Sequence, residues 1–196
     1  MRPASAYDPV FTGTSTDDSL ERVQARFEEA SEPYLRSPFN WLAWSVLLPA
    51  AALLTPTAQR GFGVSGPLLL WSLAVLLGGA VEGLLIFPRA PRQGKHRSLS
   101  AWVFRLQGNI SLVAAALSAL LLWSGLAWAV PALWLLLLGH SFYGIGGLSV
   151  TAFRTYGLIY QAAGFAALWP SGWSLHIFAA GTLVANLWMA WSVRTS

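Results

Sequence analysis

The sequence after Pro38 consists of six apolar runs separated by short polar or glycine-rich segments. A transmembrane helix needs about 20 apolar residues, within a range of about 17–25. Four of the runs have this length, whereas the first falls just below the range and the fifth lies near its lower limit. We therefore predict an all-α integral membrane protein with a bundle of six transmembrane helices, which are approximately Phe39–Leu54, Pro67–Phe87, Ala101–Trp123, Ala127–Val150, Ala152–Trp169 and Ser174–Val193.

The composition supports a membrane protein with one compact bundle. Charged residues make up only 10% of the chain, whereas soluble domains contain about 25%. Seven of the eight acidic residues precede Trp41, and the eighth is Glu82. We therefore divide the chain into a cytoplasmic tail (1–38) and a six-span transmembrane bundle (39–196).

The tail contains one segment with a helical pattern. Its apolar residues recur at steps of three or four, which predicts an amphipathic helix of roughly 15 residues. The opposite face carries acids as well as arginines, so it lacks the strongly basic character that favours anionic lipid. We expect this helix to pack on the protein's own cytoplasmic face or on a partner. The apolar stripe comprises Leu20, Val23, Phe27, Ala30 and Tyr34.

Charge asymmetry predicts the orientation in the membrane. Cytoplasmic segments of membrane proteins are enriched in lysine and arginine. With both termini inside, only Arg60 falls in an outer connection, and Arg105 falls just within the third span. We therefore expect a multi-pass protein of the bacterial cytoplasmic (inner) membrane, with the N-terminus inside. The inner basic residues are then Arg2, Arg22, Arg26, Arg36, Arg89, Arg92, Lys95, Arg97, Arg154 and Arg194.

The sequence shows no recognisable catalytic or cofactor-binding motif. HExxH, GxSxG and Walker A motifs are missing, and the chain has no cysteine. Its three histidines fall at three different depths, which does not suit a shared haem or zinc. We therefore predict no catalytic residue, cofactor or metal. The net charge of +4 follows from membrane topology, and we expect no nucleic-acid partner.

Turn sequences group the spans into three helical hairpins. LLWSGLAW joins the third and fourth spans, and ALWPSGWS joins the fifth and sixth. Each returning helix carries one strongly polar residue at a nearly equal distance from the glycine of its turn. The polar residues are Glu82, His140 and Asn186, and the turn glycines are Gly66, Gly125 and Gly172. Internal duplication and chance similarity between apolar helices both explain this pattern.

Polar residues inside the spans fall at similar depths in the cytoplasmic half. Such groups are expensive in hydrocarbon unless they find partners, so we expect them to face the interior. Glu82 is the only acid of the bundle, and Arg105 on the next helix is its expected partner, with His140 and Tyr143 as alternatives. The candidate ligand or proton pocket comprises Glu82, Arg105, Asn109, His140, Tyr143, Gln161 and Asn186.

Two explanations of this polar layer are open: hydrogen bonding that holds the helices together, or a binding site. The first predicts a scaffold or accessory subunit of a membrane complex, whose partners are the lipid bilayer and other membrane subunits or further copies of the chain. The second predicts a small transporter, channel or sensor with a cytoplasm-facing pocket around Glu82, Arg105 and His140.

Overall fold

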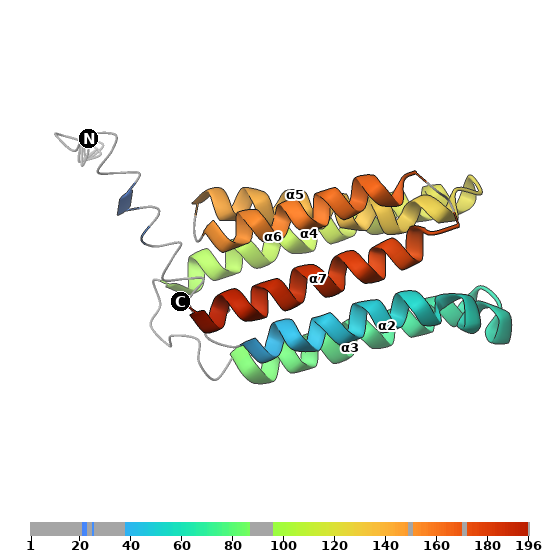
Figure 1. Ribbon diagram of the computed structural model, residues 1–196, viewed down its shortest axis with the longest axis horizontal. Coiled ribbons are helices and arrows are strands. Elements are labelled where there is room, and N and C mark those ends of the chain that lie inside the picture. The colour runs from blue at the N-terminus through green and yellow to red at the C-terminus, as the bar shows by residue number, and fades with distance from the viewer. Residues whose placement is uncertain are drawn as a thin grey trace, which may run out of the picture.

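Figure 1 shows the computed structural model of the protein, which describes residues 38–86, 96–148, 151–169 and 172–195 together with residues 21, 22 and 25. The predicted cytoplasmic tail with its amphipathic helix lies almost entirely outside the described residues, as does most of the basic loop. The boundary between tail and bundle therefore stays a prediction.

The described part of the chain is helical, as predicted. The α-helices are α2 (Pro38–Phe62), α3 (Ser65–Ile86), α4 (His96–Trp123), α5 (Val130–Leu148), α6 (Thr151–Ala167) and α7 (Ser174–Thr195), and a 3-10 helix η1 (Ala127–Ala129) precedes α5. Five of the six α-helices are long and apolar enough to cross a membrane. The exception is α6, which has 17 residues and corresponds to the short fifth run.

Helix α2 is longer than its apolar run predicts. The predicted span ends at Leu54, but α2 continues through Pro56 to Phe62 and also contains Pro49. Each proline removes one backbone hydrogen bond, yet such breaks are tolerated where neighbouring helices hold the segment. Here α2 lies between α3 and α7, and beyond the apolar run it still contacts the α3 side, where Trp71 bonds to Thr55 and Gly66 lies against Ala58.

The helices follow one another in space in the order α3, α2, α7, α6, α5, α4 (Figure 1). The two outermost helices, α3 and α4, each pack mainly on a single neighbour. Only 11% of the α3 span and 6% of the α4 span are buried, compared with 44% of the α7 span. The core therefore lies between α2, α5, α6 and α7, and two apolar helices stand at its edges.

Two of the three hairpins are closed by the same side-chain contact. In the α2–α3 hairpin, the Trp71 indole donates to Thr55 Oγ1 at 3.0 Å, and Thr55 donates to the Ala51 carbonyl. In the α4–α5 hairpin, Trp134 donates to Ser118 Oγ at 3.0 Å, and Ser118 donates to the Ala114 carbonyl. The sequence separation of tryptophan and hydroxyl is 16 residues in both hairpins. This shared contact supports the duplication hypothesis for these two hairpins.

Glycines bring α5 and α6 into backbone contact. A Cβ at Gly139 would lie 2.8 Å from the Gly157 carbonyl oxygen, and a Cβ at Gly164 would lie 2.7 Å from Leu136 Cγ. Gly146 packs in the same way against Phe153 and Arg154. The glycines recur at intervals of two helical turns on each helix, which repeats the contact along one face. The glycine-rich stretch of α5 is therefore a continuous helix whose glycine face is covered by α6.

Candidate functional site

Four fully buried polar side chains meet between α6 and α7. Tyr156 and Tyr160 lie one turn apart on α6, and Thr182 and Asn186 lie one turn apart on α7. The Tyr156 hydroxyl lies 2.9 Å from Asn186 Oδ1 and 3.1 Å from the Tyr160 hydroxyl. Asn186 Nδ2 lies 3.3 Å from the Tyr160 hydroxyl and 2.7 Å from the Thr182 carbonyl oxygen. We call Tyr156, Tyr160 and Asn186 the polar ring.

Proton counting fixes the direction of these hydrogen bonds. The single hydroxyl proton of Tyr156 serves Asn186 Oδ1, because that amide oxygen can only accept. Tyr160 then donates to the Tyr156 oxygen, and the two protons of Asn186 Nδ2 go to Tyr160 and to the Thr182 carbonyl. Every donor of the polar ring is used and the cycle closes on itself. The cycle is neutral, so it enters the low-dielectric interior without an unpaired group.

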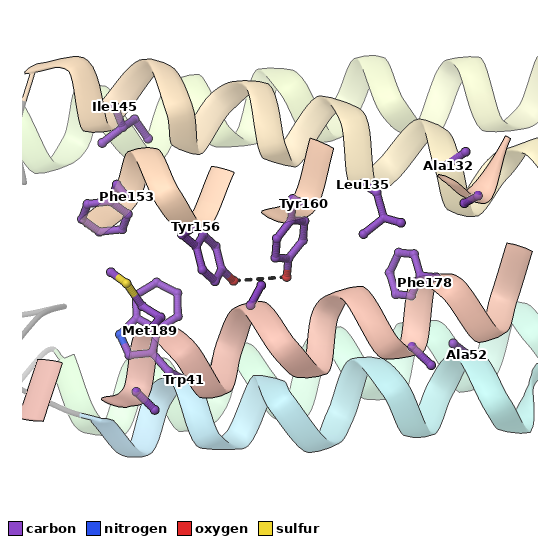
Figure 2. Close-up of a cluster of buried hydrophobic side chains, with 14 residues drawn as sticks. Trp41, Ala52, Ala132, Leu135, Ile145, Phe153, Tyr156, Tyr160, Phe178 and Met189 are labelled. Carbon is purple, nitrogen blue, oxygen red and sulfur yellow. Dashed lines mark hydrogen bonds between the residues drawn. The ribbon is translucent and has the colours of Figure 1, made fainter. Parts of the chain in front are cut away.

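Aromatic side chains from two further helices pack against the polar ring. Trp41 of α2 and Phe142 of α5 pack edge-on against Tyr156, with ring centroids 5.2 and 4.7 Å apart. Phe153 lies next to both, at 6.1 Å from Trp41 and 6.3 Å from Phe142. Figure 2 shows Trp41, Phe153 and the two tyrosines of the ring. These contacts place the cycle at the junction of α2, α5, α6 and α7. A ligand entering here would have to displace an aromatic ring and break a satisfied hydrogen bond.

Three residues of the predicted pocket are at least partly buried, in three different places. Asn186 belongs to the polar ring. Glu82 is half-buried on α3 and accepts a side-chain hydrogen bond from Trp44 of α2, whose ring lies on Gly78. Gln161 is half-buried on α6, where its Cγ lies against Gly139 of α5. Each side chain therefore contacts a different helix pair.

The other four predicted residues lie on the outside of the bundle. Arg105 and Asn109 are exposed on α4, and His140 and Tyr143 are exposed on α5, with 42% of Tyr143 accessible. Because α3 packs on α2 and α4 packs on α5, Glu82 and Arg105 belong to opposite edges of the bundle. Within the described residues, the structure does not bring the seven side chains together around one space.

The predicted pocket contains one member of the buried cluster, Asn186, and omits Tyr156, Tyr160 and Thr182. Tyrosine and threonine are common in apolar helices, and neither stands out in a search for charged or strongly polar residues. The available signal was spacing: Tyr156 and Tyr160 are four residues apart, as are Thr182 and Asn186, so each pair shares one helix face. Two polar pairs of this kind on successive helices favour a shared contact.

Two buried polar atoms among the described residues have no hydrogen-bond partner, Asn40 Oδ1 and Ser141 Oγ. Ser141 lies on α5 within the glycine-rich stretch, one residue after His140, and is 4% exposed. An unsatisfied hydroxyl in such a position destabilises the folded state. It is the only polar atom of this stretch that is both buried and unpaired in the described structure.

The described residues contain no group of three or more histidine, cysteine, aspartate or glutamate side chains that could hold a metal ion. The chemistry of the buried cluster is that of neutral hydroxyl and amide groups, which bond one another. Its arrangement fixes α6 against α7. No known protein family, curated protein or solved structure shows significant similarity to the chain.

Proposed function

We propose that the protein is a scaffold or accessory subunit of a membrane complex, and that the outward faces of α4 and α5 contact the partner. The supporting observation is that polar side chains of this bundle occupy two kinds of position. The three side chains of the polar ring satisfy one another, whereas Asn109, His140 and Tyr143 are exposed. A ligand pocket at the ring would instead need unsatisfied polar groups there.

The exposure of Asn109 and His140 is significant because both residues lie deep within their helices. Asn109 lies on α4, which ends at Trp123, and His140 lies on α5, which begins at Val130. At a rise of about 1.5 Å per residue, these side chains lie about 21 and about 15 Å from those helix ends. Both depths fall inside a hydrocarbon core of about 30 Å. An amide facing lipid there lacks hydrogen-bond partners, so a protein partner at this face would remove the penalty.

The proposed topology has six spans with both termini in the cytoplasm. Arg154 lies in the first turn of α6 and Arg194 in the last turn of α7, at the end of the bundle away from the hairpin turns, whereas Arg60 lies near a turn (Figure 1). This distribution fits the enrichment of basic residues on the cytoplasmic side. Because the chain contains no cysteine, single cysteines at Arg60 and Arg194 can be labelled from either side. We expect an impermeant reagent added outside intact cells to label position 60 alone.

Copurification tests the proposed function. The native protein, extracted in mild detergent, is expected to carry a stoichiometric subunit or further copies of itself. The variants Asn109→Leu and His140→Leu should lose this association while keeping the thermal unfolding of the isolated chain, because both side chains are exposed. Asn186→Leu is the matched control. It alters a buried position, so it should lower the unfolding temperature of the isolated chain and not remove a contact with the partner directly. A chain that is isolated alone, with unchanged behaviour in both exposed variants, would contradict the proposal.

A specific observation favours a second candidate function, a transporter or sensor that uses Glu82. An acid within a membrane span is a default functional candidate, and the hydrogen bond from Trp44 is the one polar contact described for this carboxylate. If Glu82 carries a proton or binds a ligand, Glu82→Gln should abolish transport or signalling, whereas Trp44→Phe should only modify it. If Glu82 is structural, both variants should lower stability and leave no separate functional defect.

A further inference from the structure

Neighbouring hairpins of the bundle meet in one repeated way. In each hairpin the first helix runs towards the turn and the second returns (Figure 1). The first helix of the α2–α3 hairpin packs on α7, and the first helix of the α6–α7 hairpin packs on α5. Both contacts therefore join the first helix of one hairpin to the second helix of another. Among the described helices, α4 is the first helix of a hairpin that makes no contact of this kind, and α3 is the second helix of a hairpin that makes none.

Glycines show where helices approach closely in this chain. At Gly78, Gly146 and Gly157 an added Cβ would overlap the neighbouring helix, and Gly139, Gly164 and Gly181 are equally confined. Glycine weakens a helix relative to alanine, and these contacts explain its use. Gly79 of α3, Gly108 of α4 and Gly144 of α5 differ, because an added Cβ at each would have no atom within 4 Å. No contact inside the described chain accounts for glycine at these three positions.

Gly79 and Asn109, on the two edge helices, match in distance from the turn ends of their helices. Gly79 lies on α3, which begins at Ser65, and Asn109 lies on α4, which ends at Trp123. The two residues are equally far along the chain from these turn ends, and Gly108 stands directly before Asn109. No hydrogen bond to the Asn109 side chain forms within the described part of the chain, although its amide has two donors and an acceptor. If α3 and α4 lie side by side, this amide reaches the backbone exposed at Gly79.

We propose that two copies of the chain pair through these edges, with the outer face of α4 in one copy against the outer face of α3 in the other. Copies with the same orientation in the membrane bring α4 and α3 together antiparallel, as α2 packs on α7 and α6 on α5. Figure 2 shows α4 behind α5 and α3 behind α2, on the same side of the bundle. A twofold rotation about the membrane normal therefore forms both contacts at once and closes the dimer.

The inference rests on the proposed function, because it identifies the partner subunit as a second copy. The proposed pairing also fixes the register of α3 in one copy against α4 in the other. Leu76 of α3 and Leu112 of α4 lie equally far along the chain from the turn ends of their helices, and their exposed fractions are 70% and 71%. In the paired edges these two side chains face one another across the twofold interface, one turn away from the contact between Asn109 and Gly79.

Disulfide cross-linking tests the pairing, because the chain has no cysteine of its own. Leu76→Cys and Leu112→Cys are produced in two differently tagged full-length chains, co-expressed and oxidised in native membranes. A disulfide requires Cα atoms within about 7 Å. The control replaces Leu76→Cys by Leu158→Cys, an exposed position on α6. We expect the 76–112 pair to give at least about tenfold more mixed dimer than the 158–112 pair.

A second variant separates the interface from the fold. Gly79→Ile has room within its own chain and should abolish the 76–112 cross-link without lowering the unfolding temperature of the isolated protein. Cross-linking of Leu112→Cys only with itself, or no more mixed dimer than in the control, would overturn the inference. If Asn109→Leu releases a different subunit and the mixed dimer never forms, the proposed function stands and the dimer does not.

Discussion

The Tyr156 hydroxyl donates a hydrogen bond of 2.9 Å to Oδ1 of Asn186, and this contact joins α6 to α7 in the centre of the bundle. The Asn186 amide returns a bond to Tyr160, so three side chains from two helices form one closed cycle. The cycle satisfies the buried amide of α7 without a ligand. It therefore accounts for asparagine within an apolar helix.

Removing any member of this cycle should destabilise the bundle. Tyr156→Phe leaves Asn186 Oδ1 buried without a donor, and we expect a loss of about 1–2 kcal/mol in unfolding free energy. Asn186→Leu leaves one of the two tyrosine hydroxyl protons without an acceptor, so its loss should be of similar size. Unfolding in mixed detergent micelles measures both. Unchanged stability in either variant would contradict the closed cycle.

The two tryptophan–hydroxyl contacts should stabilise their hairpins independently. Thr55→Val and Ser118→Ala each remove the acceptor of one indole, and hydrogen bonds of this kind between membrane helices contribute about 0.6 kcal/mol, up to about 1.7. Losses from Thr55→Val and Ser118→Ala should add, because the contacts lie in separate hairpins. Thr55→Val combined with Trp71→Phe should lose less than the sum of the single variants. Strict additivity for that pair would show that the indole does not bond to Thr55.

Glycines of α5 should respond to substitution according to the face they occupy. Gly139→Ala places a Cβ 2.8 Å from the Gly157 carbonyl oxygen, so α5 and α6 must separate, and we expect a loss of about 1–3 kcal/mol. Gly144→Ala meets no atom within 4 Å and should gain about 0.5–1 kcal/mol through helix propensity. Thermal unfolding of the isolated chain compares them. A similar loss in both variants would mean that Gly144 is also enclosed by the fold.

Ser141→Ala should stabilise the protein. The hydroxyl is buried without a hydrogen-bond partner, and its removal relieves a desolvation penalty of about 1 kcal/mol or more. His140→Ala is the matched control, because its side chain is exposed and its removal should leave the stability of the isolated chain nearly unchanged. Destabilisation by Ser141→Ala would show that the hydroxyl has a partner, such as a buried water molecule.

The sequence was sufficient to predict the helical fold and the number of helices in the bundle, because these depend on the length of the apolar runs. It did not reveal which way each polar residue faces. Helices such as α5 are apolar on every side, so their pattern does not select the face that packs inward. The glycines of α5 make that selection by contacting α6, and His140 and Tyr143 are thereby turned outward.

The order of the helices in space also could not be predicted from the sequence. The loop after Glu82 leads to Arg105 on the next helix, which suggested a direct pair. Instead α2, the first helix of the α2–α3 hairpin, packs on α7. This contact places the bundle core between α3 and α4. Long-range packing between hairpins is decided by side-chain shape over many residues, which composition and spacing do not encode.

Photo-cross-linking at Leu112 is the most direct test of the claim that the α4 edge contacts protein. A photoreactive amino acid at this position, which is 71% exposed in the isolated chain, reports what covers the outer face of α4 in the native membrane. A scaffold role for the α4 edge predicts a protein adduct at Leu112 and mainly lipid adducts at Leu158 on α6. Lipid adducts alone at both positions would show that α4 faces the bilayer, and would contradict a scaffold role for this edge.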